Sequence, residues 1–266
     1  MSRGEALSTS ISLPVSSTHP SAAPAVDRHR PLRLWLVELR KLVDTPAGIA
    51  LLALAALLAG VFGGGVALVT DETTLDRIVR LAGIPAGILL PVLAALLATG
   101  DRQHRTALTG YALTPRRGQV LAAKAWAVIS LAVVAWVLAL LAGVLIAAVA
   151  TPLVNHPIEW SINWTGQLWF ALGHVLAALA GYAVGLVAGN APAAVSILLA
   201  WPVFALFLGI VPQIAEVLAW LDINALAAFA DGIEPVEVAR VATGVAAWVI
   251  LPGTVGVLRE LRREVR

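Results

Sequence analysis

The chain has 266 residues, of which 59% are hydrophobic and 13% are charged, and its mean hydropathy is +0.88. A soluble domain carries about 25% charged residues, so this composition excludes a soluble enzyme, a nucleic-acid-binding protein and a disordered chain, and indicates a protein of the lipid bilayer. The sequence has no cysteine, which excludes disulfides, thiolate metal sites and cysteine nucleophiles.

The chain begins with two segments that precede the apolar region. Residues 1–30 are rich in Ser, Pro and Ala and have no apolar run of signal-peptide length, so we expect a disordered cytoplasmic tail. Residues 31–45 are expected to form an amphipathic helix that lies in the membrane interface. The alternative is a plain juxtamembrane helix with a solvated charged face. Its expected apolar face comprises Leu32, Trp35, Leu36, Leu39, Leu42 and Val43.

Six apolar segments follow within residues 46–266. Each is near or above the ~20 residues that a helix needs to cross a bilayer, and β-barrel alternation is absent from the sequence. The predicted fold is therefore an all-α integral membrane bundle of six transmembrane helices, with short external re-entrant helices at 212–240 before the last span. The six segments are 47–70, 81–99, 120–150, 166–188, 191–211 and 241–258.

The distribution of charge predicts the orientation of these spans. With six spans, 15 of the 18 Lys and Arg residues fall on one side of the membrane. The other side carries three basic residues and nine acids, most of them near 71–76 and within 212–240. By the positive-inside rule, both termini are cytoplasmic, and the protein is a multi-pass protein of the cytoplasmic membrane.

Catalytic and metal-binding motifs are missing from the sequence. There is no Walker phosphate loop, so we expect no ATP hydrolysis by this chain alone, and there is no H-E-x-x-H zinc motif or nucleophilic serine in a G-x-S setting. We expect no enzyme activity, bound metal or cofactor in this chain. Lys124 is expected to snorkel to the cytoplasmic surface. His174 is then the only ionisable candidate inside the spans, either as a transport residue or as a helix-contact residue.

Small residues and prolines interrupt several spans. Gly173, Gly181 and Gly185 belong to a ridge of small residues at a spacing of four, which allows close helix packing within the chain or a dimer seam. Pro91 and Pro202 permit kinks in the second and fifth spans. Together with His174, these two prolines are the residues that we expect to lie along a transport pathway.

The connection between the second and third spans, at 100–119, is basic and contains Gly110 and Pro115. Its composition alone fits a positive-inside anchor. Its order of residues also resembles that of the permease subunits of type-2 ABC exporters, the ABC-2 family. The residues that carry this resemblance are Asp101, where the family more often has Glu, Arg105-Thr106, Tyr111, Pro115-Arg116-Arg117, Lys124 and the Glu38-Leu-Arg-Lys41 segment.

The resemblance implies a division of labour between subunits. The 100–119 segment would be a coupling helix that contacts a separate cytoplasmic ABC ATPase, through Asp101, Arg102, Arg105, Thr106, Tyr111, Pro115, Arg116 and Arg117. Residues 31–45 would be the family's elbow helix. Gly189 and Asn190 would make a second, smaller contact, although the basic residue that often precedes the Asn-like position is missing.

The expected function is therefore that of an exporter permease. A second permease copy or a paralogous permease would complete the transmembrane part, in contact with membrane lipid, and the ATPase would bind ATP-Mg. Alternating access would move a hydrophobic or amphipathic compound, such as a drug, a peptide antibiotic or a lipid-like molecule. The alternative function is a membrane scaffold or assembly factor that transports nothing.

Overall fold

The computed structural model describes residues 30–103, 117–230 and 232–262. Six of its helices are long and apolar enough to cross a membrane. They comprise α2 (Pro46–Val69), α3 (Leu75–Gln103), α5 (Arg117–Ala150), α6 (Trp164–Ala188), α7 (Ala191–Leu208) and the continuous segment of α9 (Pro235–Val245), η2 (Ala246–Ile250) and α10 (Leu251–Arg262). The predicted all-α bundle of a multi-pass membrane protein is thus confirmed. The expected tail at 1–30 lies almost wholly outside the described residues.

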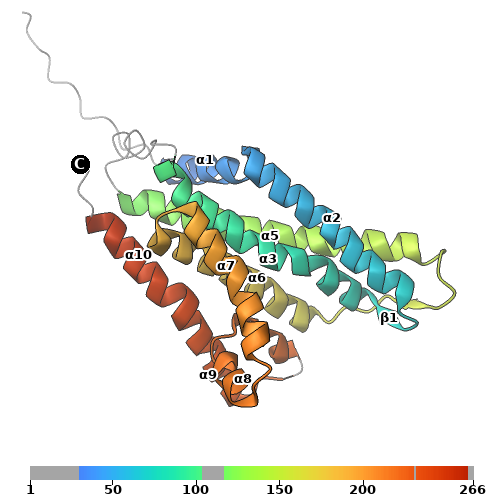
Figure 1. Ribbon diagram of the computed structural model, residues 1–266. Coiled ribbons are helices and arrows are strands. Elements are labelled where there is room, and N and C mark those ends of the chain that lie inside the picture. The colour runs from blue at the N-terminus through green and yellow to red at the C-terminus, as the bar shows by residue number, and fades with distance from the viewer. Residues whose placement is uncertain (1–29, 104–116, 231, 263–266) are drawn as a thin grey trace, which may run out of the picture.

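Helix α1 (Arg30–Asp44) lies across one end of the bundle, where α3 ends and α5 begins (Figure 1). Leu42 is buried there, and Trp35 Nε1 donates a hydrogen bond of 3.1 Å to Ser130 Oγ of α5. The chain then turns at Thr45, whose side chain caps α2 by accepting from the Gly48 amide at 3.1 Å. A helix thus covers most of the residues expected to be amphipathic, with part of its apolar face packed on α5, and its placement in the membrane interface stays a prediction.

Helices α3 and α6 form the central pair of the bundle. In the most apolar 18-residue stretch of each helix, 61% of α3 and 50% of α6 is buried inside the structure, against 11% of α2 and of α7. The two helices approach closely because small residues face each other: a Cβ atom at Gly181 would overlap the backbone of Pro91, and one at Gly185 would lie 2.9 Å from Ala95 Cα. The outer helices α2 and α7 leave most of their apolar surface exposed.

Most of the described basic residues lie at one end of the bundle and most of the described acids at the other; Figure 1 shows the elements of the two ends. The basic end holds α1, the end of α3, the start of α5, the α6–α7 turn and the end of α10. The acidic end holds β1 (Thr73–Thr74) and β2 (Ile158–Glu159), which pair in parallel, together with α8 (Pro212–Ala219) and the 3₁₀ helix η1 (Ile223–Ala230). The described acids at this end are Asp71, Glu72, Asp76, Glu159, Glu216, Asp222, Glu234 and Glu237.

The segment expected to precede the last span is shorter than 212–240. It contains α8 and η1, but α9 already begins at Pro235, which serves as its N1 residue. The last span also contains one π turn, η2, in which the Leu251 amide bonds to the Ala246 carbonyl. Pro252 follows directly and has no N–H to offer the Trp248 carbonyl four residues earlier, which favours the wider turn at this point.

Candidate functional site

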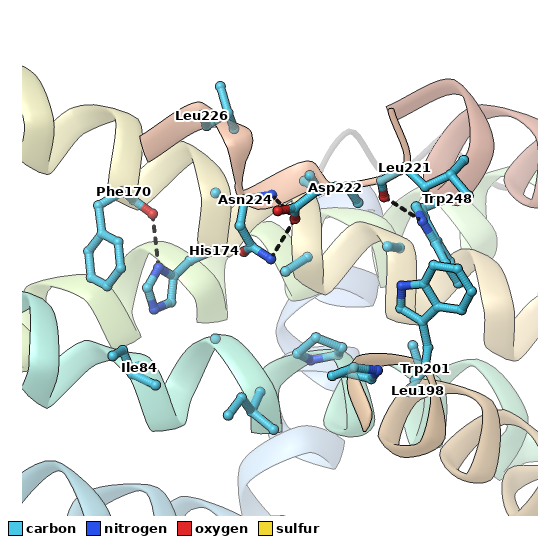
Figure 2. Close-up of a pocket in the computed structure, with 18 of the residues that line it drawn as sticks. Ile84, Phe170, His174, Leu198, Trp201, Leu221, Asp222, Asn224, Leu226 and Trp248 are labelled. Carbon is cyan, nitrogen blue, oxygen red and sulfur yellow. Dashed lines mark hydrogen bonds between the residues drawn. The ribbon is translucent and has the colours of Figure 1, made fainter. Parts of the chain in front are cut away.

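A cavity of about 440 Å³ opens between the central helix pair and the last two spans (Figure 2). Its walls come from five elements, α3, α6, α7, η1 and η2. Most of its lining is apolar, and a few polar groups converge on it, which is the usual character of a ligand site. Because η1 belongs to the acidic end, the cavity lies toward that end of the bundle.

The structure brings the three expected pathway residues together around this cavity. His174 of α6, Pro91 of α3 and Pro202 of α7 all line it. Gly173 lines it too, and the position that a Cβ atom of this residue would occupy has no atom within 4 Å. The expected helix packing therefore describes Gly181 and Gly185, which lie against α3 within the chain, and does not describe Gly173.

His174 joins the two central helices through their backbones. It is buried, with 3% of its surface exposed, and its ring packs edge-on against Phe170 at a centroid distance of 4.5 Å. Its Nδ1 lies 2.9 Å from the Phe170 carbonyl of α6, and its Nε2 lies 3.0 Å from the Gly83 carbonyl of α3. A neutral imidazole donates to one of these oxygens and an imidazolium to both. In either state, backbone carbonyls cover both ring nitrogens.

Aromatic rings form the opposite wall of the cavity (Figure 2). Trp201 of α7 and Trp248 of the π turn lie with ring centroids 4.9 Å apart and planes at 57°. Trp248 Nε1 donates to the Leu221 carbonyl at 3.0 Å, which ties the π turn to the segment that leads into η1. Trp169 of α6 also lines the cavity and packs edge-on against Phe229 of η1 at 5.0 Å.

Two polar residues, Asp222 and Asn224, lie where η1 begins. Asp222 Oδ1 accepts hydrogen bonds from the Asn224 amide at 2.8 Å and from Asn224 Nδ2 at 3.0 Å, so this carboxylate has a defined orientation (Figure 2). Both residues line the cavity and are exposed. Among the described residues that line the cavity, Asp222 is the only carboxylate, and none is Lys or Arg.

Three of the expected ATPase-contact residues lie in helices that the structure describes, at the basic end, and the other five lie outside the described residues. Asp101 and Arg102 belong to the last turn of α3, and Arg117 is the first residue of α5. Arg105, Thr106, Tyr111, Pro115 and Arg116 are not among the residues that the structure describes. Helix α1 contacts both α3, which ends at Gln103, and α5, which begins at Arg117.

The α6–α7 turn is well defined. Gly189 adopts φ 74°, a conformation in which glycine is favoured, and ends α6. Asn190 Oδ1 accepts from the Ala193 amide at 2.9 Å and so caps α7. Arg259 of α10 donates to the Val187 carbonyl at 3.0 Å and brings a basic side chain to this turn. Sequence reasoning missed Arg259 because 72 residues separate it from Val187.

Lys124 does not extend to the surface as expected. It is 4% exposed, and its Nζ donates to the Leu97 carbonyl of α3 at 3.1 Å. The snorkelling prediction was wrong because α1 and α3 cover this part of α5. A buried ammonium group needs partners of this kind, since an uncompensated charge inside a bundle is costly.

Sequence comparison adds no assignment to this site. No protein-family model matches the chain, and no curated protein is significantly similar to it in sequence. Within the described residues, no group of three or more His, Asp or Glu side chains comes together in a way that could hold a metal ion. The chemistry of the site therefore depends on the cavity and on the charges around it.

Proposed function

We propose that the chain is the permease subunit of an ATP-driven ABC-2 exporter in the cytoplasmic membrane. The observation that supports the proposal is which segments of the chain lie together at the basic end. The last turn of α3, the first turn of α5, the Gly189-Asn190 turn and α1 all lie at that end (Figure 1), and these are the segments that the family resemblance assigns to ATPase contact and to the elbow. Their order along the chain matches the ABC-2 order over residues 31–266.

Helix α3 offers a route from such a contact to the cavity. It begins at the acidic end, forms one wall of the cavity at Ile84, Gly87 and Pro91, and ends at the expected coupling segment. A force applied by an ATPase at the basic end would act on a helix that packs along the whole of α6. In this proposal the cargo is hydrophobic or amphipathic, and it leaves toward the acidic, external side.

The exposed apolar faces of α2 and α7 are consistent with contact to lipid and to a second permease in the proposed complex. Only 11% of the apolar part of each helix is buried within the chain. In the proposed complex, a second permease copy or a paralogous permease and membrane lipid cover these faces. The ATP-Mg is bound by the ATPase subunits.

The proposed orientation predicts which residues a membrane-impermeant thiol reagent will reach. Because the chain has no cysteine, Glu234→Cys and Arg262→Cys each introduce a single thiol at an exposed position. In intact cells, the reagent should label Glu234→Cys at the acidic end. It should label Arg262→Cys at the basic end only after the membrane is permeabilised. The opposite pattern would overturn the orientation.

The proposed ATPase contact predicts a strong effect of charge reversal. Arg116→Glu should reduce the permease-stimulated ATP hydrolysis of a co-expressed ABC ATPase from the same cell by about tenfold or more, because a repelling charge at a contact costs several kcal/mol. Arg28→Glu is the matched control, since it reverses a basic charge in the expected tail and should leave the stimulation unchanged. The measurement is ATP turnover by the complex reconstituted in lipid.

Two results would contradict the assignment. One is the absence of a complex with any ABC ATPase of the cell. The other is a complex whose ATP hydrolysis responds equally to Arg116→Glu and to Arg28→Glu. A stable complex in which the chain never changes ATP turnover would favour the scaffold or assembly role instead.

A further inference from the structure

We propose that the cavity between α3, α6, α7, η1 and η2 is a binding site for an organic cation with a bulky apolar body. The carboxylate of Asp222 and the indole faces of Trp201 and Trp248 would receive the cationic group, and the apolar wall would receive the body. The site rests on the proposed function for its role as a cargo site. Binding itself is a property of the purified chain and needs no ATPase.

The charge of the expected ligand follows from the polar groups around the cavity. Asp222 Oδ1 takes both hydrogen bonds from Asn224, and Oδ2 accepts none from the described residues. No Lys or Arg lies among the described lining residues to neutralise this carboxylate. An anionic ligand would therefore meet an unpaired negative charge in the cavity lining, whereas a cation would be attracted to it.

Most of the side-chain donors that line the cavity are engaged elsewhere, the indole N–H groups of Trp169 and Trp201 being the exceptions among the described residues. Both ring nitrogens of His174 face backbone carbonyls, Trp248 Nε1 donates to the Leu221 carbonyl, and Asn224 Nδ2 donates to Asp222. What these residues present to the cavity is oxygen atoms and aromatic rings. Both carry negative potential, and the face of an indole ring is the best cation–π partner among side chains.

The two indole rings are held in a fixed geometry. Trp248 is fixed by its hydrogen bond to Leu221, and Trp201 packs against it at 57°. The rings therefore offer two differently inclined faces without loss of side-chain freedom on binding, which is the basis of preorganised recognition. Quaternary ammonium and similar cations, which cannot donate hydrogen bonds, are recognised by such rings.

The size and location of the cavity fit a drug-sized ligand. Its volume of about 440 Å³ falls in the range of known small-molecule pockets, and Ile84, Ile88 and Leu198 supply apolar contacts. Asp222 is exposed, and the neighbouring acids Glu216, Glu234 and Glu237 belong to the same end of the bundle. An excess of acids at this end of the bundle raises the concentration of cations near it.

Binding of tetraphenylphosphonium to the purified chain in lipid nanodiscs tests the proposal. This cation and tetraphenylborate have nearly the same shape and opposite charge, so their comparison isolates the effect of charge. We expect saturable binding of radiolabelled tetraphenylphosphonium that unlabelled tetraphenylphosphonium displaces. Tetraphenylborate should show no saturable binding that depends on Asp222.

Matched substitutions locate the site. Asp222→Asn keeps an oxygen that can accept from Asn224 but removes the charge, and it should weaken tetraphenylphosphonium binding about tenfold. Glu216→Gln removes a charge from the same end outside the cavity and should have little effect. Trp201→Leu should weaken binding by a similar factor, and Trp201→Phe should restore most of it because an aromatic face remains.

Specific outcomes would overturn the proposal. They are a monodisperse, helical wild-type chain that shows no saturable binding, equal effects of Asp222→Asn and Glu216→Gln, or binding that Trp201→Leu leaves unchanged. Failure of the exporter assignment gives a different result, in which the cation binds as expected and no ABC ATPase responds to the chain. The two failures are therefore distinguishable.

Discussion

Gly181→Ala should destabilise the protein by about 2 kcal/mol, because the added methyl group would overlap the backbone of Pro91 in α3. Overpacking a tight contact costs about 1–3 kcal/mol or more. The contact here is with backbone atoms, which cannot move aside as a side chain would, so α3 and α6 would have to separate. This cost exceeds the ~1 kcal/mol by which alanine favours a helix over glycine.

Gly173→Ala is the matched control on the same helix. No atom lies within 4 Å of the new Cβ, so the free energy of unfolding should stay the same or rise by up to about 1 kcal/mol. The measurement is unfolding by SDS in mixed micelles, followed by tryptophan fluorescence. Equal stability of the two variants would show that α6 and α3 are not in close contact, and would instead favour a role for the glycine ridge in a dimer.

Gln167→Ala should destabilise the acidic end by about 3 kcal/mol. Gln167 is fully buried, its Nε2 donates to Asp76 Oδ1 at 3.0 Å, and its Oε1 accepts from Trp136 Nε1 at 3.3 Å. The substitution removes a hydrogen bond to a charged group and leaves the Trp136 N–H without this acceptor. A lost hydrogen bond to a charged group costs about 1.5–3 kcal/mol, and the loss of an acceptor for the half-buried Trp136 N–H adds to this.

Gln213→Ala is the control for this prediction. Gln213 lies exposed on α8, and its truncation should change the free energy of unfolding by no more than about 0.5 kcal/mol. The same SDS unfolding measurement compares the two variants. A Gln167→Ala protein as stable as the Gln213→Ala protein would mean that the hydrogen bonds between α3, α5 and α6 at this end contribute no stability.

The approximate bounds of the helices could be predicted because the signals that set them, hydropathy and capping residues, are local in the sequence. A bilayer demands about 20 apolar residues in succession, and the fifth span, expected over about 191–211, is the helix Ala191–Leu208, which Asn190 caps. The start of the last span was predicted six residues late, at 241. The polar residues Glu237 and Arg240 in the first turns of α9 concealed it.

The candidate site was predicted only in part. His174 was singled out because a titratable group is costly inside a membrane helix, and Pro91 and Pro202 because a proline permits a kink in its span. Nothing in the sequence distinguished Trp201, Trp248 and Asp222, since tryptophans occur throughout the spans and acids throughout the external segments. Their role as cavity residues depends on the packing of α7, η1 and η2 beside α6.

The amino-acid sequence by itself determined the number of spans, their approximate bounds and the separation of basic from acidic residues, because hydropathy and charge act along the chain whatever the helices pack against. Only the tertiary structure decided which faces meet. The contact of Gly181 with Pro91, the burial of Lys124 beneath its neighbours and the approach of Arg259 to Val187 each join residues from different helices. Such contacts depend on the rotation and register of each helix, which close packing sets and which periodicity alone leaves open.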